Sequence, residues 1–305
     1  MEITDRYRRT LKRKHCSSHT VKSYMNIVGH FIQWLAVPLN EVTRKDMGTY
    51  VDRLLRKRLK PKTITCHLQV IRLFFDYLID DEGMRMDNPV TRISIRLPTP
   101  LPRHLRDNQV GALFSVITDL RDKAMFMLML RCGLRVEEIA NLSTDAIDLR
   151  RRRLLVFNGK GGKDRVVYRS EDAQSALEAY LRQRPSKAKG LFLVQKGTMK
   201  GSPISVRGIQ KRIEYYGKKG KVHVSCHQLR HTMATQLLNA DAALVTIQDL
   251  LGHGQITTTQ RYCRVADLKV QRDYYRAIEV VMQRTQLHAE DRFELPEKQV
   301  KENRV

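Results

Sequence analysis

Apolar side chains in the first third of the chain recur every three or four residues, which is the spacing of one face of an α-helix. The clearest series is Val21, Tyr24, Val28, Phe31 and Leu35. Ser18 or Thr20 is expected to cap the start of this helix. A second helix is expected over residues 44–58, with Thr43 as its cap. The apolar positions of a third helix are Ile64, Leu68, Ile71, Phe75 and Leu78.

A proline-rich segment follows these helices, with three prolines within residues 98–102. Proline cannot continue a helix or donate a hydrogen bond to a sheet. Residues 98–103 are therefore expected to form an extended linker. It would join a helical domain over residues 1–97 to a second domain over residues 104–285, which a charged tail over residues 286–305 follows.

The second domain combines two kinds of periodicity. Short β-like runs at residues 154–157 and 165–168 flank a segment rich in turn residues, which predicts a β-hairpin with a flexible basic tip. Helical patterns occupy the rest of the domain, at about residues 106–118, 120–131, 171–183, 205–216, 228–239, 242–251 and 268–283. The expected fold is therefore mainly α with a small β-sheet or hairpin (α+β).

The charge balance indicates the class of partner. The chain has 56 Lys and Arg residues against 32 Asp and Glu residues, a net charge of +24, and the excess is spread over both halves. A polyanion such as double-stranded DNA matches a surface of this kind, because basic side chains neutralise phosphates and release counterions.

Other classes of protein are disfavoured. No apolar run is long enough to cross a membrane, and the charged N-terminal residues lack the apolar core of a secretion signal, so a cytoplasmic protein is expected. The five cysteines are scattered and form no CxxC pair, so neither a zinc site nor a disulfide framework is expected.

Several local motifs carry possible chemistry, and each is weak alone. Lys160 lies in a Gly-rich segment that lacks the Ser or Thr of a phosphate-binding P-loop. His227 and His231 have the spacing of a zinc protease helix, but Gln228 stands where the HExxH motif has glutamate. No ATP site, metal site or other cofactor is therefore expected.

Taken together, these motifs resemble a known family. The ordered set is Arg135, Lys160, His227-x-x-Arg230, Leu251-Gly252-His253 and Tyr262. In order and spacing it is similar to the phage integrase family, the tyrosine recombinases. Residues 1–97 resemble that family's helical core-binding domain, and residues 104–283 resemble its catalytic domain. Gln228 and the pair Cys263-Arg264 depart from residues common in the family, at positions that its chemistry does not require.

The resemblance implies a role for each matched residue. Arg135 and Arg230 would clamp the non-bridging oxygens of a phosphodiester, since a guanidinium fork fits two such oxygens. Tyr262 would be the nucleophile, with His227 accepting or relaying its proton. Lys160 would protonate the departing 5′-oxygen and His253 would hydrogen-bond the phosphate, while Glu138 would orient Arg135. The 3′-phosphotyrosine product conserves bond energy, so the resemblance implies an enzyme that needs neither ATP nor metal.

The resemblance also implies an architecture and an assembly. The two domains would form a clamp around DNA, and four protomers would join two DNA sites, with the 268–283 helix packing on a neighbouring protomer. An Xer-like or transposon-encoded enzyme is expected. The expected DNA contacts outside the catalytic set are Thr20, Lys22, Lys62, Arg72, Arg207 and Lys211.

Three alternatives stay open at this point. The nearest is a type IB topoisomerase or a hairpin-forming resolvase, which use closely similar chemistry. The second is a non-catalytic architectural DNA-binding protein, and against it stands the fact that every catalytic position is filled. The third is a zinc hydrolase using His227 and His231.

Overall fold

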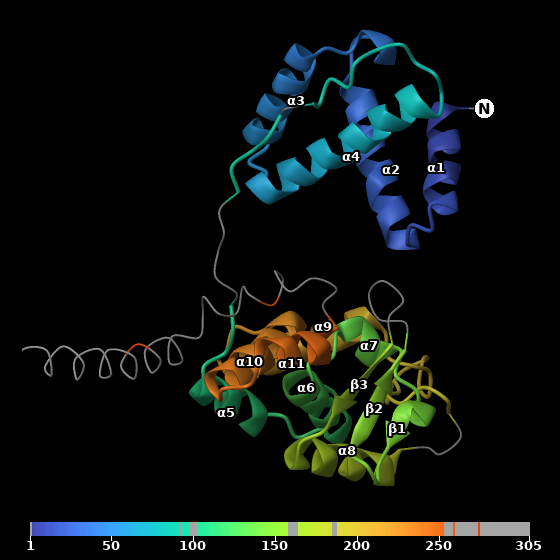
Figure 1. The fold of residues 1–305 in the computed structure, drawn as a ribbon. Coiled ribbons are helices and arrows are strands. Elements are labelled where there is room, and N and C mark those ends of the chain that lie inside the picture. Colours follow the sequence, from blue (N-terminus) through green and yellow to red (C-terminus); the bar gives the residue numbers. More distant parts are fainter. Residues whose placement is uncertain are drawn as a thin grey trace, which may run out of the picture. The chain divides into compact units, whose positions relative to one another are not determined.

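The computed structural model describes residues 2–91, 93–97, 103–157, 164–184 and 188–252, together with Thr259 and Tyr274. The chain divides into two compact units, residues 1–100 and 101–305 (Figure 1). Both are largely helical, and a small sheet lies in the second, which confirms the predicted fold class. The expected segments 98–102, 268–283 and 286–305 lie outside the described residues, apart from Tyr274.

The first unit is a bundle of helices around an aromatic core. Phe31 meets Tyr50 edge-on at 5.1 Å between ring centroids, and Phe75 lies 6.0 Å from Phe31. Helix α4 packs against α2 and α3, and α2 packs against α1. The elements are α1 (Ile3–Arg13), α2 (Ser18–Trp34), the 3₁₀ turn η1 (Leu39–Glu41), α3 (Arg44–Arg56) and α4 (Pro61–Asp80).

Local side chains decide where these helices begin. Thr43 caps α3 as predicted, in a reciprocal pair with Asp46. The predicted cap of α2 was wrong, because Ser17 has the extended backbone of a cap and its Oγ accepts from the backbone N–H of Thr20 at 3.1 Å. Helix α1 was not predicted, although Tyr7 and Leu11, one helical turn apart, are both buried in the core.

The second unit surrounds a buried helix. Helix α6 packs against α8 and α10 (Figure 1). Most of its apolar side chains are buried. The helices are α5 (Asp107–Ser115), α6 (Leu120–Cys132), α7 (Val136–Ala140), α8 (Glu171–Gln183), α9 (Val206–Lys219), α10 (Cys226–Asn239) and α11 (Leu244–Leu251), with a 3₁₀ turn η2 (Thr144–Ala146). None of the described helices has the length and apolar character of a membrane-spanning segment.

The sheet has three antiparallel strands, in the order β1 (Ile147–Asp148), β2 (Arg153–Val156) and β3 (Arg165–Tyr168). Strands β2 and β3 form the predicted hairpin, with Val156 opposite Arg165. Strand β1 was not predicted, because two residues are too few to show an alternation. Residues 158–163 of the expected hairpin tip lie outside the described residues.

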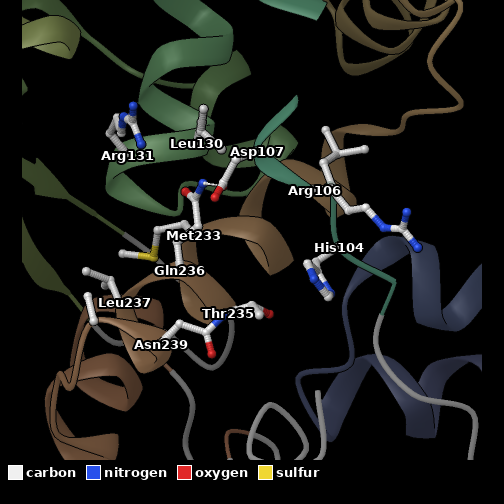
Figure 2. Close-up of a pocket in the computed structure, with 12 residues that line it drawn as sticks. His104, Arg106, Asp107, Leu130, Arg131, Met233, Thr235, Gln236, Leu237 and Asn239 are labelled. Carbon is white, nitrogen blue, oxygen red and sulfur yellow. Dashed lines mark hydrogen bonds between the residues drawn. The ribbon is translucent and has the colours of Figure 1, made fainter. Parts of the chain in front are cut away.

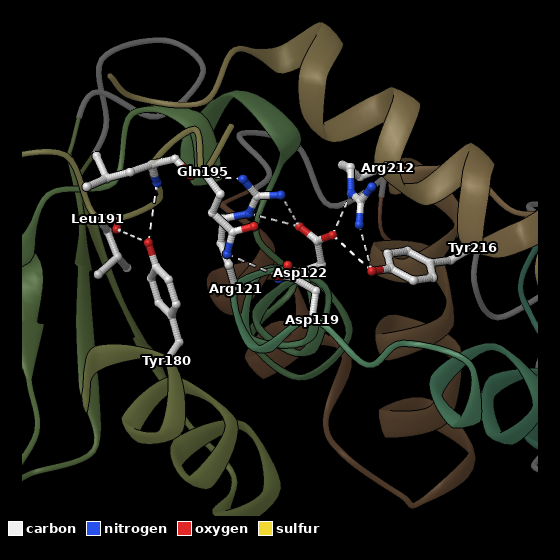
Figure 3. A network of polar contacts seen from close by, with 9 residues as sticks. Asp119, Arg121, Asp122, Tyr180, Leu191, Gln195, Arg212 and Tyr216 are labelled. Carbon is white, nitrogen blue, oxygen red and sulfur yellow. Dashed lines mark hydrogen bonds and ion pairs between the residues drawn. The ribbon is translucent and has the colours of Figure 1, made fainter. Parts of the chain in front are cut away.

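A buried ionic cluster fixes α9 to the start of α6 (Figure 3). Asp122 is fully buried and accepts from Arg121 at 2.7 Å and from Arg212 of α9 at 2.5 Å. The hydroxyl of Tyr216 donates to the same carboxylate at 3.1 Å. Because a buried carboxylate is costly without such partners, these contacts specify how α9 sits on α6.

Replacing Asp122→Asn is expected to lower the free energy of unfolding by about 3 kcal/mol, since it leaves buried Arg121 without its counter-charge. Urea unfolding at pH 7 measures this loss. The control is Asp145→Asn, at an exposed position of the same unit, which should change stability by less than about 0.5 kcal/mol. Equal effects from the two substitutions would contradict the assignment.

Candidate active site

Arg135 lies at a sharp turn between two helices. Helix α6 ends at Cys132, and Gly133 follows in the left-handed conformation with φ of 65°. A Cβ at Gly133 would stand 3.0 Å from Leu251, so glycine suits this position for its backbone and for the space it leaves. Arg135 then caps α7, and Glu138 accepts from both its backbone N–H and its Nη1, each at 2.8 Å.

Arg230 reaches the same place from α10. Its side chain is buried, with 2% of the residue exposed. Nη1 donates to the carbonyl of Gly133, and Nη2 donates to the carbonyl of Leu251. Both carbonyls belong to helix ends, where backbone acceptors have no partner within the helix. The buried guanidinium and the two helix ends therefore satisfy one another.

The end of α11 supplies a third carbonyl. Gly252 caps this helix in the left-handed conformation, and its carbonyl accepts from Nη2 of Arg135 at 3.4 Å. The C-terminal end of a helix carries partial negative charge, which favours a nearby cation. The ends of α6 and α11 thus hold Arg135 and Arg230, which are far apart in the sequence, at one place.

His227 stands in the first turn of α10, beside these arginines. Burial lowers its pKa below the ordinary value of 6.5, and the positive charges of Arg230 and Arg135 lower it further. The imidazole is therefore neutral at pH 7 and can accept a proton. His231 meets it edge-on at 4.3 Å, and the described residues contain no cluster of three potential metal ligands.

Arg135, His227 and Arg230 line one cleft of about 660 Å³. Arg207 of α9 lies on its wall, is exposed, and makes a 3.8 Å ion pair with Glu214. Lys211 is exposed one turn further along the same helix. The cleft thus carries several cationic groups around a neutral imidazole, which suits an anionic phosphodiester.

Three predicted site residues, Lys160, His253 and Tyr262, lie outside the described residues. The described residues that precede Lys160 and His253 in the chain lie near Arg135. Phe157, the last described residue before Lys160, lines a second hollow of about 590 Å³ together with Arg135 and Glu138. Gly252, which directly precedes His253, contacts Arg135 as described above.

The predicted DNA contacts of the first unit differ in their surroundings. Lys22 and Lys62 are exposed. The hydroxyl of Thr20 pairs with that of Ser17 at 2.8 Å, at the start of α2. Arg72 donates to the carbonyls of Val90 and Ile93 at 3.1 and 3.4 Å, so it also holds the segment that follows α4.

Arg165 lies beside Arg135 and Glu138, although the sequence motif does not include it. It donates to both carboxylate oxygens of Glu138 at 2.8 Å and to the carbonyl of Leu250 at 2.9 Å. Burial alone would raise the pKa of Glu138, but the hydrogen bonds from Arg165 and Arg135 and the charge of Arg165 outweigh burial and lower it to about 2. A signal existed, because Arg165 shares the face of its strand with Val167, which is buried.

A third hollow, of about 790 Å³, lies away from these groups (Figure 2). We call it the α5–α10 groove. Leu130, Met233 and Leu237 give it apolar walls. Thr235 Oγ1 and Asn239 Oδ1 are buried beside it and have no hydrogen-bond partner among the described residues. The groove carries neither Arg135 nor His227.

Comparisons with known proteins give matches over most of the chain. Residues 103–269 match the phage integrase family, and residues 3–83 match the phage integrase N-terminal SAM-like domain. Tyrosine recombinase XerA of Pyrococcus horikoshii is 30% identical over 265 residues, which is 87% of this chain and 89% of that protein. Tyrosine recombinase XerD of Vibrio cholerae is 34% identical over 82% of this chain and 87% of its own length.

Among solved structures, the chain resembles a lambda integrase dimer bound to a COC′ core site. The TM-score is 0.72, and the match covers 88% of this chain and 95% of that one. The sequence identity is 16%, so this likeness concerns the fold.

Replacing Glu138→Gln is expected to lower the free energy of unfolding at pH 7 by about 3 kcal/mol, because the folded-state pKa of this carboxyl lies below its unfolded value of about 4.3. That stabilisation is complete above about pH 5 and is lost as the pH falls toward 2. Urea unfolding at pH 7 and pH 3.5 should therefore show a smaller gap between the two proteins at the lower pH. Exposed Glu137, changed to Gln, is the matched control, and an equal gap at both pH values would contradict the prediction.

Proposed function

This chain belongs to the phage integrase family of tyrosine recombinases, and from that membership we propose which of its residues perform DNA recombination. Its activity is site-specific DNA strand transfer, which in this family needs neither ATP nor a metal ion. The similar proteins XerA, XerD and lambda integrase are recombinases or integrases, so a topoisomerase, a hairpin-forming resolvase, a zinc hydrolase and an architectural protein are not favoured.

The convergence of Arg135 and Arg230 beside neutral His227 carries the proposal. The two guanidinium groups would bind the non-bridging oxygens of the scissile phosphate, where negative charge develops in the transition state. They are already held by carbonyl and carboxylate groups, so little reorganisation is needed when DNA binds. Glu138 would keep Arg135 in place.

In the proposed reaction, the phenolic oxygen of Tyr262 attacks the phosphorus and forms a 3′-phosphotyrosine bond. The bond from phosphorus to the 5′-oxygen breaks. His227 accepts the phenol proton, and Lys160 gives a proton to the departing 5′-oxygen, which leaves as a hydroxyl. Attack by the 5′-hydroxyl of a partner strand reverses these steps and rejoins the DNA, so no external energy source is required.

The substrate is proposed to be double-stranded DNA carrying a recombination site. Both units would contact it, with Lys22, Lys62 and Thr20 acting from the first unit and Arg207 and Lys211 from α9 in the second. Arg72 would contribute less, because its guanidinium already binds two carbonyls. We also propose that the protein acts in the cytoplasm, because its proposed substrate is DNA.

We further infer that four protomers join two such sites, and the α5–α10 groove is the proposed contact (Figure 2). Its apolar walls suit an amphipathic helix, and the sequence predicts one over residues 268–283. Residues 268–283 of one protomer would enter the groove of the next. The lambda integrase match is a dimer bound to DNA, which agrees with contacts between protomers.

The reaction is tested by trapping its covalent intermediate on nicked suicide duplexes taken from DNA flanking the gene, in the presence of chelator. Wild type should give a slower band on a denaturing gel, and Tyr262→Phe should give none, a loss of at least about 10³-fold, since the nucleophile is gone. Tyr274→Phe is the control and should give the band. A band that persists in Tyr262→Phe would show that another residue is the nucleophile.

The assembly is tested by native mass spectrometry on DNA carrying the site found by that trap. Leu237→Lys places a charge in the groove and is expected to prevent four-protomer complexes, whereas Val245→Lys, at an exposed position on α11, should leave them intact.

A chain ending at residue 267 should also form no four-protomer complexes. When this truncated chain is mixed with Leu237→Lys, the truncated chain supplies an intact groove and Leu237→Lys supplies an intact 268–283 segment. The mixture should therefore form pairs of one truncated chain and one Leu237→Lys chain, and no larger complexes. Four-protomer complexes of Leu237→Lys alone would refute the contact.

A further inference from the structure

Arg165 occupies an unusual position for a strand arginine. Its side chain is 8% exposed, and it begins β3 at the pair with Val156, the last described pair before residues 158–163. Its guanidinium makes three hydrogen bonds, to Oε1 and Oε2 of Glu138 and to the carbonyl of Leu250. Neither the spacing of the motif nor the proposed reaction gives Arg165 a role.

One carboxylate connects Arg165 to Arg135. Each oxygen of Glu138 accepts two hydrogen bonds: Oε1 from the guanidinium groups of both arginines, and Oε2 from Arg165 and from the backbone of Arg135. All four bonds measure 2.8 Å. The direction of the carboxylate, and through it the direction of Arg135, therefore depends on the bidentate contact with Arg165.

Arg165 also lies against the end of α11. A Cβ at Gly252 would stand 3.0 Å from its Cδ and 3.3 Å from its Nε and Nη1. The carbonyl of Gly252 is a second acceptor for Arg135. Arg165 thus fixes both of the groups that hold Arg135, namely Glu138 directly and the turn at Gly252 by packing and by its bond to Leu250.

We propose that Arg165 is a positioning residue for DNA cleavage, which acts by holding Glu138 and the α11 turn so that Arg135 meets the scissile phosphate. This inference rests on the proposed function. The Arg165 side chain is 8% exposed and its guanidinium is bonded to Glu138 and Leu250, so in this proposal it acts through those groups and not on DNA directly. Its loss should slow the chemical step and leave DNA affinity nearly unchanged.

The first test compares Arg165→Lys with Arg169→Lys. Arg169 is a matched control, since it is a buried arginine just after the same strand, and it donates to the carbonyls of Arg153 and Asp148 and to Gln174. Lysine keeps the charge and loses the two-pronged contact. Single-turnover cleavage should fall by about 10²-fold in Arg165→Lys, with DNA affinity within about 3-fold of wild type. Arg169→Lys should lower the melting temperature and keep the cleavage rate.

Two further measurements separate positioning from a general structural defect. The double variant Arg165→Lys/Glu138→Gln should lose less cleavage than the two single losses multiplied together, because both residues act in part through the carboxylate of Glu138. A methylphosphonate at the scissile position removes the charge that Arg135 would neutralise, so the deficit of Arg165→Lys should shrink at least 10-fold on that substrate. A structural defect would give additive losses and an unchanged deficit.

Failure of the positioning role of Arg165 and failure of the proposed function give different results. If wild type forms no Tyr262-dependent complex, the proposed function is wrong. If wild type forms it and Arg165→Lys cleaves at the wild-type rate, or loses activity only in proportion to its lower stability, the positioning role of Arg165 is wrong.

Discussion

Three guanidinium groups of like charge gather where α6 and α11 end, and the structure must offset their mutual repulsion. The carbonyls of Gly133, Leu250, Leu251 and Gly252 and the carboxylate of Glu138 accomplish this. Helix ends are suitable for the purpose, because their carbonyls lack intrahelical partners and carry partial negative charge. The cationic site therefore exists only where these two helices terminate together.

This arrangement has a consequence for catalysis. Because the arginine side chains are already oriented, they lose little conformational freedom when the phosphate binds. Their full electrostatic attraction is therefore available to stabilise the transition state. The same positive charges, together with burial, keep the imidazole of His227 neutral at pH 7. The positive charge of the arginines thus has two effects. It attracts the anionic phosphate, and it keeps His227 in the neutral form that can accept a proton.

Helix α6 links the site to the rest of its unit. At one end, Asp122 binds Arg212 and Tyr216 and so holds α9, whose residue Arg207 lies on the cleft wall. At the other end, the carbonyl of Gly133 holds Arg230. The buried apolar surface of α6 keeps these two ends at a fixed separation, since close packing leaves little room for adjustment. Helix α6, together with the packing of α9 against α5 and α7, thus sets the position of the cleft wall relative to the arginines.

The sequence by itself determined the helical class, the hairpin, the cap at Thr43 and the ordered motif from which the catalytic residues are proposed, because periodicity, turn residues and motif order are local properties of the chain. It could not show α1, whose apolar positions are few, or β1, which is only two residues long. Nor could it show that Arg165 shares Glu138 with Arg135, or that helix-end carbonyls hold Arg230. Those contacts join residues distant in the chain, and only tertiary packing brings a helix end, a strand and a buried carboxylate within hydrogen-bond distance.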